Sequence, residues 1–166
     1  MVYCAIDDIK KIINAVLLQL SDDTDSAIVS AEMLDVAVAG GDLTGYTEAE
    51  QAAVAVVMAN IVEAIDNADS MIDGYAASRY LTPFNPVPRL IHVISIDIAI
   101  YNLYSRRENV PEIREKRYKD AVRLLDRLAD GKLTIGEVDK PVVESSGVIK
   151  SVTRPKLFGR DTLDNY

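Results

Sequence analysis

The residues that could perform chemistry are few and lie far apart in the chain. Cys4 is the only cysteine and His92 the only histidine, so these residue types cannot supply the several ligands of a zinc site. The two could form a nucleophile and base pair, but no motif supplies an oxyanion site or a third group that would orient the base. We therefore interpret His92 as a core or interface residue.

Two polar segments resemble binding motifs only superficially. The acidic cluster of Asp22, Asp23 and Asp25 lacks the central glycine and closing glutamate of a calcium-binding loop, so it predicts a turn and a helix end. The glycine-rich segment 40–45 lacks the Gly-Lys-Ser/Thr ending of a phosphate-binding loop. The sequence thus predicts no catalytic residue, no metal and no cofactor, and we expect a protein that is not an enzyme.

The composition favours a single globular domain. The chain has 166 residues, of which 49% are hydrophobic, which is enough for a sizeable core. Its longest apolar stretch, residues 90–104, contains His92 and Asp97 and is shorter than the ~20 residues of a membrane helix. The N-terminus has no basic stretch before its apolar residues, unlike a signal peptide. We expect synthesis in a reducing cytoplasm and no membrane association.

The charge is distributed unevenly along the chain. The net charge is −8, and residues 1–75 hold 2 Lys and Arg against 14 Asp and Glu, whereas residues 76–166 hold 16 against 12. The acidic total makes direct nucleic-acid binding an unlikely function, because such binding depends on neutralising phosphates. A basic run follows in the second half: Arg106, Arg107, Arg114, Lys116, Arg117, Lys119, Arg123 and Arg127. It could contact an acidic surface, or solvate a helix and pair internally with Glu112, Glu115, Asp120 and Asp126.

Hydrophobic periodicity predicts a mainly α fold of about four to five helices. We expect helices over residues 5–20, about 27–39, 47–75, 90–104 and 111–130. Thr47 and Glu50 have capping-box spacing, Pro111 suits a first helical position, and Gly131 a helix end. Alternating isoleucines make 90–104 ambiguous with a strand, and its length favours a helix. We predict a helical domain over 1–137 and an extended C-terminal arm over 138–166, where the periodicity stops.

Asp97 lies on a helix face that should be buried, one turn from Val93 and from Tyr101. A buried charge needs a partner. Arg79, which precedes Tyr80 beside the proline-rich loop, is our candidate for that partner. The alternative is that Asp97 reaches solvent at the rim of its helix.

Several short motifs, taken in their order, resemble a protein family encoded by Mu-like prophages, whose members look like connector or head-completion proteins. The resemblance is clearest over roughly residues 70–166. The motifs are Ile72-Asp73-Gly74-Tyr75, Arg79-Tyr80, the Pro83 to Pro88 loop, Asp97 to Tyr104, Arg117 to Val122, Gly131 to Gly136, and Leu157-Phe158-Gly159-Arg160-Asp161.

The resemblance implies a structural protein of the phage virion, a subunit of the neck between head and tail that is made in the bacterial cytoplasm. Such a subunit would contact copies of itself in a ring and the neighbouring head or portal and tail proteins. We expect the contact residues to be Arg114, Arg117 and Arg123 in the basic run, and Phe158, Arg160 and Asp161 in the arm. The alternative is an acidic protein-binding or regulatory module of a prophage, whose N-terminal half occupies a basic groove or mimics nucleic acid.

Overall fold

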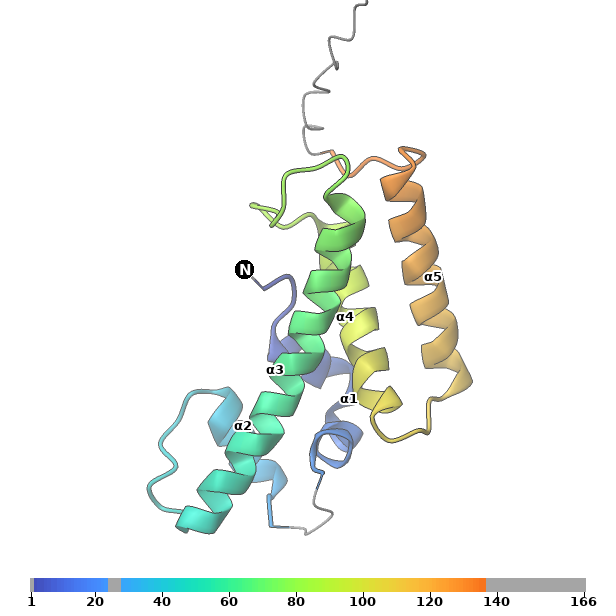
Figure 1. Cartoon of the computed structure of the whole chain (residues 1–166). Helices are drawn as coiled ribbons and strands as arrows, with labels where there is room; N and C mark the ends of the chain where they lie inside the picture. Colours follow the sequence, from blue (N-terminus) through green and yellow to red (C-terminus); the bar gives the residue numbers. More distant parts are fainter. Residues whose placement is uncertain (1, 24–27, 137–166) are drawn as a thin grey trace, which may run out of the picture.

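The computed structural model describes residues 2–23 and 28–136. These residues form five α-helices and no strand, which confirms the mainly α prediction (Figure 1). The helices are α1 (Ile6–Ser21), α2 (Ala31–Val38), α3 (Glu48–Ala76), α4 (Arg89–Ser105) and α5 (Glu112–Ala129). The predicted arm over 138–166 lies outside the described residues. Among the helices described, none combines the length and apolar character that crossing a membrane requires.

The longest helix, α3, begins at the predicted capping box. The Thr47 N–H donates to Glu50 Oε2 at 2.7 Å, and the Glu50 N–H donates to Thr47 Oγ1 at 3.4 Å. These bonds satisfy two amides that would otherwise lack partners at the helix start. The helix ends at Ala76, one residue beyond the predicted range of 47–75. One face carries the core residues Val54, Val57, Ile61, Ala64, Ile65, Ala68 and Ile72.

The core of the bundle forms around α4, which packs against α1, α3 and α5. Its alternating isoleucines, which also suit a strand, are all buried: Ile94, Ile96, Ile98 and Ile100. Residues two positions apart point to different sides of a helix, and here the neighbouring helices α1, α3 and α5 cover those sides. The alternation thus reflects a helix that is apolar on most of its circumference.

Two helix starts differ from the sequence prediction. α2 begins only at Ala31, because Ser30 is its N-cap and the Ser30 Oγ accepts the Met33 N–H at 3.2 Å. Pro111 is the N-cap of α5 and not its first residue. The end of α5 agrees with the prediction, since Gly131 has a φ of +74°, a conformation that favours glycine at a helix end.

The arrangement places α2 and α5 on different flanks of the bundle (Figure 1). α2 packs against α1 and α3, beside the N-terminal part of α3, whereas α5 packs against α3 and α4. The acidic α2 and the start of α3 are therefore separated from the basic α5 by the core of the bundle.

Candidate interaction surfaces

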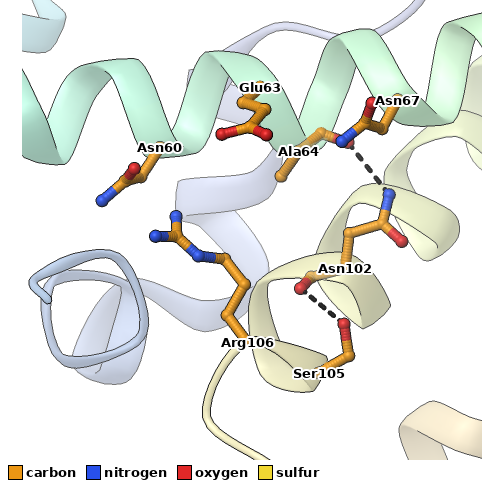
Figure 2. A pocket seen from close by; sticks show the side chains of 7 residues that line it. All are labelled: Asn60, Glu63, Ala64, Asn67, Asn102, Ser105 and Arg106. Atoms are coloured by element: carbon orange, nitrogen blue, oxygen red, sulfur yellow. Dashed lines mark hydrogen bonds between the residues drawn. The ribbon is translucent and has the colours of Figure 1, made fainter.

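A polar pocket of about 330 Å³ lies between α3 and α4 (Figure 2). Its lining consists of Asn60, Glu63, Ala64, Asn67, Asn102, Ser105 and Arg106. Some of these polar groups bond within the fold: Asn102 Nδ2 donates to the Ala64 carbonyl at 3.1 Å, and Ser105 Oγ donates to the Asn102 carbonyl at 2.8 Å. The first of these bonds joins α4 to α3, so part of the lining has a structural role.

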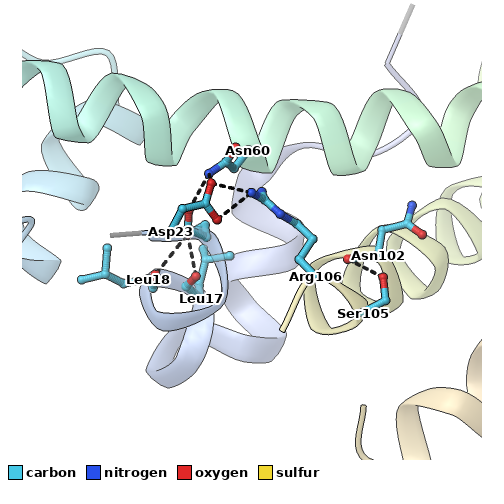
Figure 3. Close-up of polar contacts among 8 residues, drawn as sticks. Leu17, Leu18, Asp23, Asn60, Asn102, Ser105 and Arg106 are labelled. Carbon is cyan, nitrogen blue, oxygen red and sulfur yellow. Dashed lines mark hydrogen bonds and ion pairs between the residues drawn. The ribbon is translucent and has the colours of Figure 1, made fainter. Parts of the chain in front are cut away.

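Beside this pocket, a cluster of Asp23, Asn60 and Arg106 joins the ends of two helices to α3 (Figure 3). Asn60 Nδ2 donates to the Ser21 carbonyl at 2.8 Å and to Asp23 Oδ2 at 3.0 Å. Arg106 Nη2 lies 2.8 Å from both carboxylate oxygens of Asp23. From the sequence, Asp23 was interpreted only as part of a turn. In the structure, its contacts also hold the end of α1 against α3 and α4.

A second polar network, which is more deeply buried, holds the N-terminal residues to α3 and α4. The Asp69 carboxylate accepts the Tyr3 N–H and the Ser95 hydroxyl, each at 2.8 Å. Ser95 Oγ also lies 3.2 Å from Cys4 Sγ. Asp69 is 6% exposed. Burial raises its pKa above the ordinary value, and the two hydrogen bonds oppose that rise. We call Tyr3, Cys4, Asp69 and Ser95 the N-terminal anchor.

The Tyr3 side chain extends this anchor towards the loop between α3 and α4. Its hydroxyl donates to Asp73 and accepts the Phe84 N–H at 3.1 Å. The Tyr3 carbonyl lies 2.8 Å from His92 Nδ1, and His92 Nε2 lies 3.7 Å from Asp8 Oδ2. These contacts connect Tyr3 to α3, to the loop between α3 and α4, and to α4.

This geometry does not support a nucleophilic pair of Cys4 and His92. Cys4 is 2% exposed, and its hydrogen-bond partner is Ser95. Burial raises the pKa of the thiol to about 11, so it is protonated at neutral pH and a poor nucleophile. The two His92 ring nitrogens lie instead against Tyr3 and Asp8. His92 is therefore held within the fold by these contacts, but its side chain is 37% exposed and it is not a core residue.

Asp97 pairs with a different arginine from the one that the sequence suggested. Its carboxylate lies 3.4 Å from Arg117 Nη1, across the contact between α4 and α5. The side chain of Asp97 is 15% exposed and that of Arg117 is 52% exposed, so the pair lies at the rim of the core. Arg79 follows the end of α3, and its guanidinium lies against Gly131 beyond α5. Tyr80 is buried, with its ring centroid 5.9 Å from that of Phe84.

The three arginines that were proposed as contact residues have different environments. Arg114 is half-buried and Arg117 is engaged with Asp97, whereas Arg123 is exposed and lies 3.1 Å from Asp120 on its own helix. Within α5, Lys119 also pairs with Glu115. Internal pairing thus occurs at some positions of the basic run, but side chains such as that of Arg123, 72% exposed, still reach solvent. The proposed contact residues Phe158, Arg160 and Asp161 lie outside the described residues.

Comparison with known proteins decides the family. The family model for bacteriophage Mu Gp36 matches residues 3–152, which is most of the chain. The chain belongs to the bacteriophage Mu Gp36 family. It is 30% identical to the Mu-like prophage FluMu protein gp36 of Haemophilus influenzae over 109 residues, 65% of this chain and 76% of that protein. It is 28% identical to gene product J of Escherichia phage Mu over 100 residues, 59% of this chain and 70% of that protein.

The Gp36 family match confirms that this is a Mu-like phage protein and extends the resemblance towards the N-terminus. The motifs recognised in the sequence begin near residue 70, whereas the matched region begins at residue 3. It therefore includes the whole N-terminal anchor, in which Tyr3 and Cys4 contact residues of α3 and α4.

Sequence reasoning missed one residue that organises this Gp36 chain, namely Asp69. The signal for it was present, because Asp69 is four residues after Ile65 and three before Ile72 and so lies beside the buried stripe of α3. A carboxylate at such a position needs buried donors. Its donors, Tyr3 and Ser95, come from other parts of the chain, and periodicity within one helix does not identify them.

Proposed function

We propose that this Gp36-family chain is a structural subunit of the phage virion, located in the connector between head and tail. It acts by assembly, without catalysis, and it contacts copies of itself and the neighbouring head or portal and tail proteins. The observation that carries the proposal is that exposed acidic residues of α2 and α3 and exposed basic residues of α5 belong to elements that lie on different flanks of the bundle (Figure 1). A closed ring is built from heterologous contacts, in which one surface meets a different surface of the next copy.

The acidic surface is formed by α2, the loop after it and α3. Its exposed carboxylates belong to Glu32, Asp35, Asp42, Glu48, Glu63 and Asp66, of which Asp35 pairs with Lys10. The other surface is the exposed side of α5, where the cations outnumber the carboxylates: Lys116, Arg117, Lys119, Arg123 and Arg127 against Glu112, Asp120 and Asp126. Complementary charge of this kind raises the association rate and fixes the register between subunits. The predicted arm, residues 138–166, remains part of the proposal as a further contact with a neighbour.

The location is tested by measuring the chain in purified particles. We expect a fixed copy number per particle, concentrated at the neck, by quantitative mass spectrometry and electron microscopy with a labelled chain. Particles that lack the chain would contradict the proposal and favour the regulatory module, which should stay a monomer or small dimer. Removal of residues 138–166 should weaken incorporation, which tests the arm separately.

The charge mechanism is tested by the rate of assembly at different salt concentrations. Exposed charges are screened over ~10 Å at 0.1 M salt, so assembly followed by light scattering should slow as salt rises. Arg123→Glu should slow it already at low salt. Arg89→Glu is the matched control, because Arg89 is also exposed but begins α4. Equal slowing by both variants would exclude a specific role of α5.

A further inference from the structure

The exposed side of α3 is unusually apolar over its first half. Between Glu48 and Glu63, every exposed residue of this helix is an alanine or a valine: Ala49, Ala52, Ala55, Val56, Ala59 and Val62. Val56 is 48% exposed and Val62 is 43% exposed. We call these residues the α3 stripe. Except for the adjacent Ala55 and Val56, successive members are three positions apart, and all lie on one side of the helix over a length of about 20 Å.

Such a surface differs from an ordinary solvent-facing helix, which carries charged and polar side chains. Alanine side chains are small enough for a second helix to approach closely. Exposed carboxylates stand at both ends of the stripe, Glu48 before it, and Glu63 and Asp66 after it. The chemistry that fits is therefore a helix with long side chains whose stems are apolar and whose ends are cationic.

The exposed side of α5 has this chemistry. Ile113 is 59% exposed at its start. Lys116, Arg123 and Arg127 follow at spacings that place them on the same side of the helix, and all are exposed. Asp120 is exposed on this side as well and pairs with Arg123, so the three cations outnumber one carboxylate. Lysine and arginine can cover apolar surface with their methylene stems while their charged ends stay in water. Laid on the α3 stripe, these ends could reach the flanking carboxylates.

We propose that the α3 stripe of one copy binds the exposed side of α5 of the next copy. This inference rests on the proposed function and names the surfaces that a connector subunit would use. Both surfaces are exposed in one chain, and the first half of α3 and α5 lie on different flanks (Figure 1). A contact between copies therefore leaves one surface of each kind free at the ends, and further copies can add.

The size of the stripe determines how the contact has to be measured. A strip about 20 Å long and one helix wide is much smaller than the ~800 Å² per partner of a standard stable interface. We therefore expect weak binding between purified chains and stable binding only with the other contacts of the particle. For the purified chain, the suitable assay is covalent trapping of the contact. For the particle, it is the amount of each variant that is incorporated.

For trapping, the full chain carries Val56→Cys together with Arg123→Cys and is treated with a short bismaleimide at high concentration. The native Cys4 is buried. The wild-type chain, treated in the same way, measures any crosslinking through Cys4. We expect a ladder of dimers and larger species. The matched control is Ser70→Cys with Arg123→Cys, because Ser70 is exposed on the same side of α3 beyond the stripe. An equal ladder for both pairs, or no ladder, would overturn the proposal. A dimer formed by Val56→Cys alone as efficiently as by the pair would show that stripes bind each other and would also overturn it.

For incorporation, Ala52→Glu is compared with Ser70→Glu in particles. Both changes add one charge on the same side of α3, and glutamate is a good helix former, so circular dichroism should show both variants folded. Covering the new carboxylate with another helix is costly. We expect Ala52→Glu to reduce incorporation about tenfold or more and Ser70→Glu to leave it near the wild-type level. Normal incorporation of Ala52→Glu would refute the contact made by the α3 stripe and leave the proposed function intact. Particles that lack the wild-type chain would refute the proposed function itself.

Discussion

Removal of the Asp69 carboxylate should destabilise the whole bundle, because this group joins the N-terminus to two helices. In Asp69→Ala, the Tyr3 N–H and the Ser95 hydroxyl lose their acceptors, both at 2.8 Å in the structure. A buried donor without an acceptor costs about 1–3 kcal/mol. The Ser95 hydroxyl can turn to Cys4 Sγ, a weak acceptor 3.2 Å away. The cost of leaving this hydroxyl without the carboxylate should therefore be near the lower end of that range. We expect the free energy of unfolding to fall by about 2–4 kcal/mol.

The measurement is urea denaturation at pH 7, followed by circular dichroism. In a domain of this size each kcal/mol corresponds to about 2–4 °C in Tm, so a thermal scan should show a fall of about 6–12 °C for a loss near 3 kcal/mol. Asp66→Ala is the matched control, because Asp66 is an exposed aspartate one turn earlier on α3. An unchanged midpoint for Asp69→Ala, or an equal loss in the control, would refute the argument.

The pH dependence tests the electrostatic part of the same argument. Burial raises the pKa of Asp69 in the folded chain, so the folded state binds this proton more tightly than the unfolded state does. The resulting stability is complete below the ordinary aspartate pKa of ~3.9 and is lost as the pH rises through the raised folded value. Asp69→Asn cannot titrate. The stability of the wild type relative to Asp69→Asn should therefore fall with rising pH, and a constant difference would contradict the assigned direction of the shift.

Substitutions at three further positions test local features of the fold by urea denaturation. Thr47→Ala removes the N-cap of α3 and should cost about 1 kcal/mol, whereas Thr47→Ser should restore most of that loss. Gly131→Ala should cost about 1–2 kcal/mol, because φ is +74° and the new Cβ would meet the Arg79 guanidinium; a neutral effect would show that this turn relaxes freely. Asp97→Ala should cost about 1 kcal/mol or less, since its partner Arg117 is half exposed, and a loss above 3 kcal/mol would indicate a fully buried pair.

The helices were predictable because each carries its own local signals. The capping box at Thr47 and Glu50 fixed the start of α3, and Gly131 marked the end of α5. The alternating isoleucines of α4 were harder, because a strand and a helix that is buried all round give the same apolar run. Its length favoured the helix, and the reason for the continuous apolar run lies in its neighbours, since α1, α3 and α5 all pack on α4.

The partners of buried charges were not predictable from local signals. The position of Asp97 showed that it needed a partner, but Arg117 is 20 residues away on another helix, and its selection depends on how α5 lies on α4. Asp69 is a stronger case, because one of its donors is the backbone amide of Tyr3, 66 residues earlier. Almost every residue has a backbone amide, so the sequence does not indicate which amide will donate to Asp69.

The positions of the polar contacts on α3 explain how one helix can serve both the fold and an assembly contact. Asn60 and Asp69 are buried, and their bonds to Ser21, Tyr3 and Ser95 hold α3 to the rest of the bundle. The α3 stripe lies on the exposed side of the same helix. Substitutions at Asn60 or Asp69 should therefore lower the stability of the isolated chain, whereas substitutions in the stripe should affect binding between copies and leave that stability nearly unchanged. Because the two effects are measured by different assays, α3 can be tested as a scaffold and as a contact surface independently.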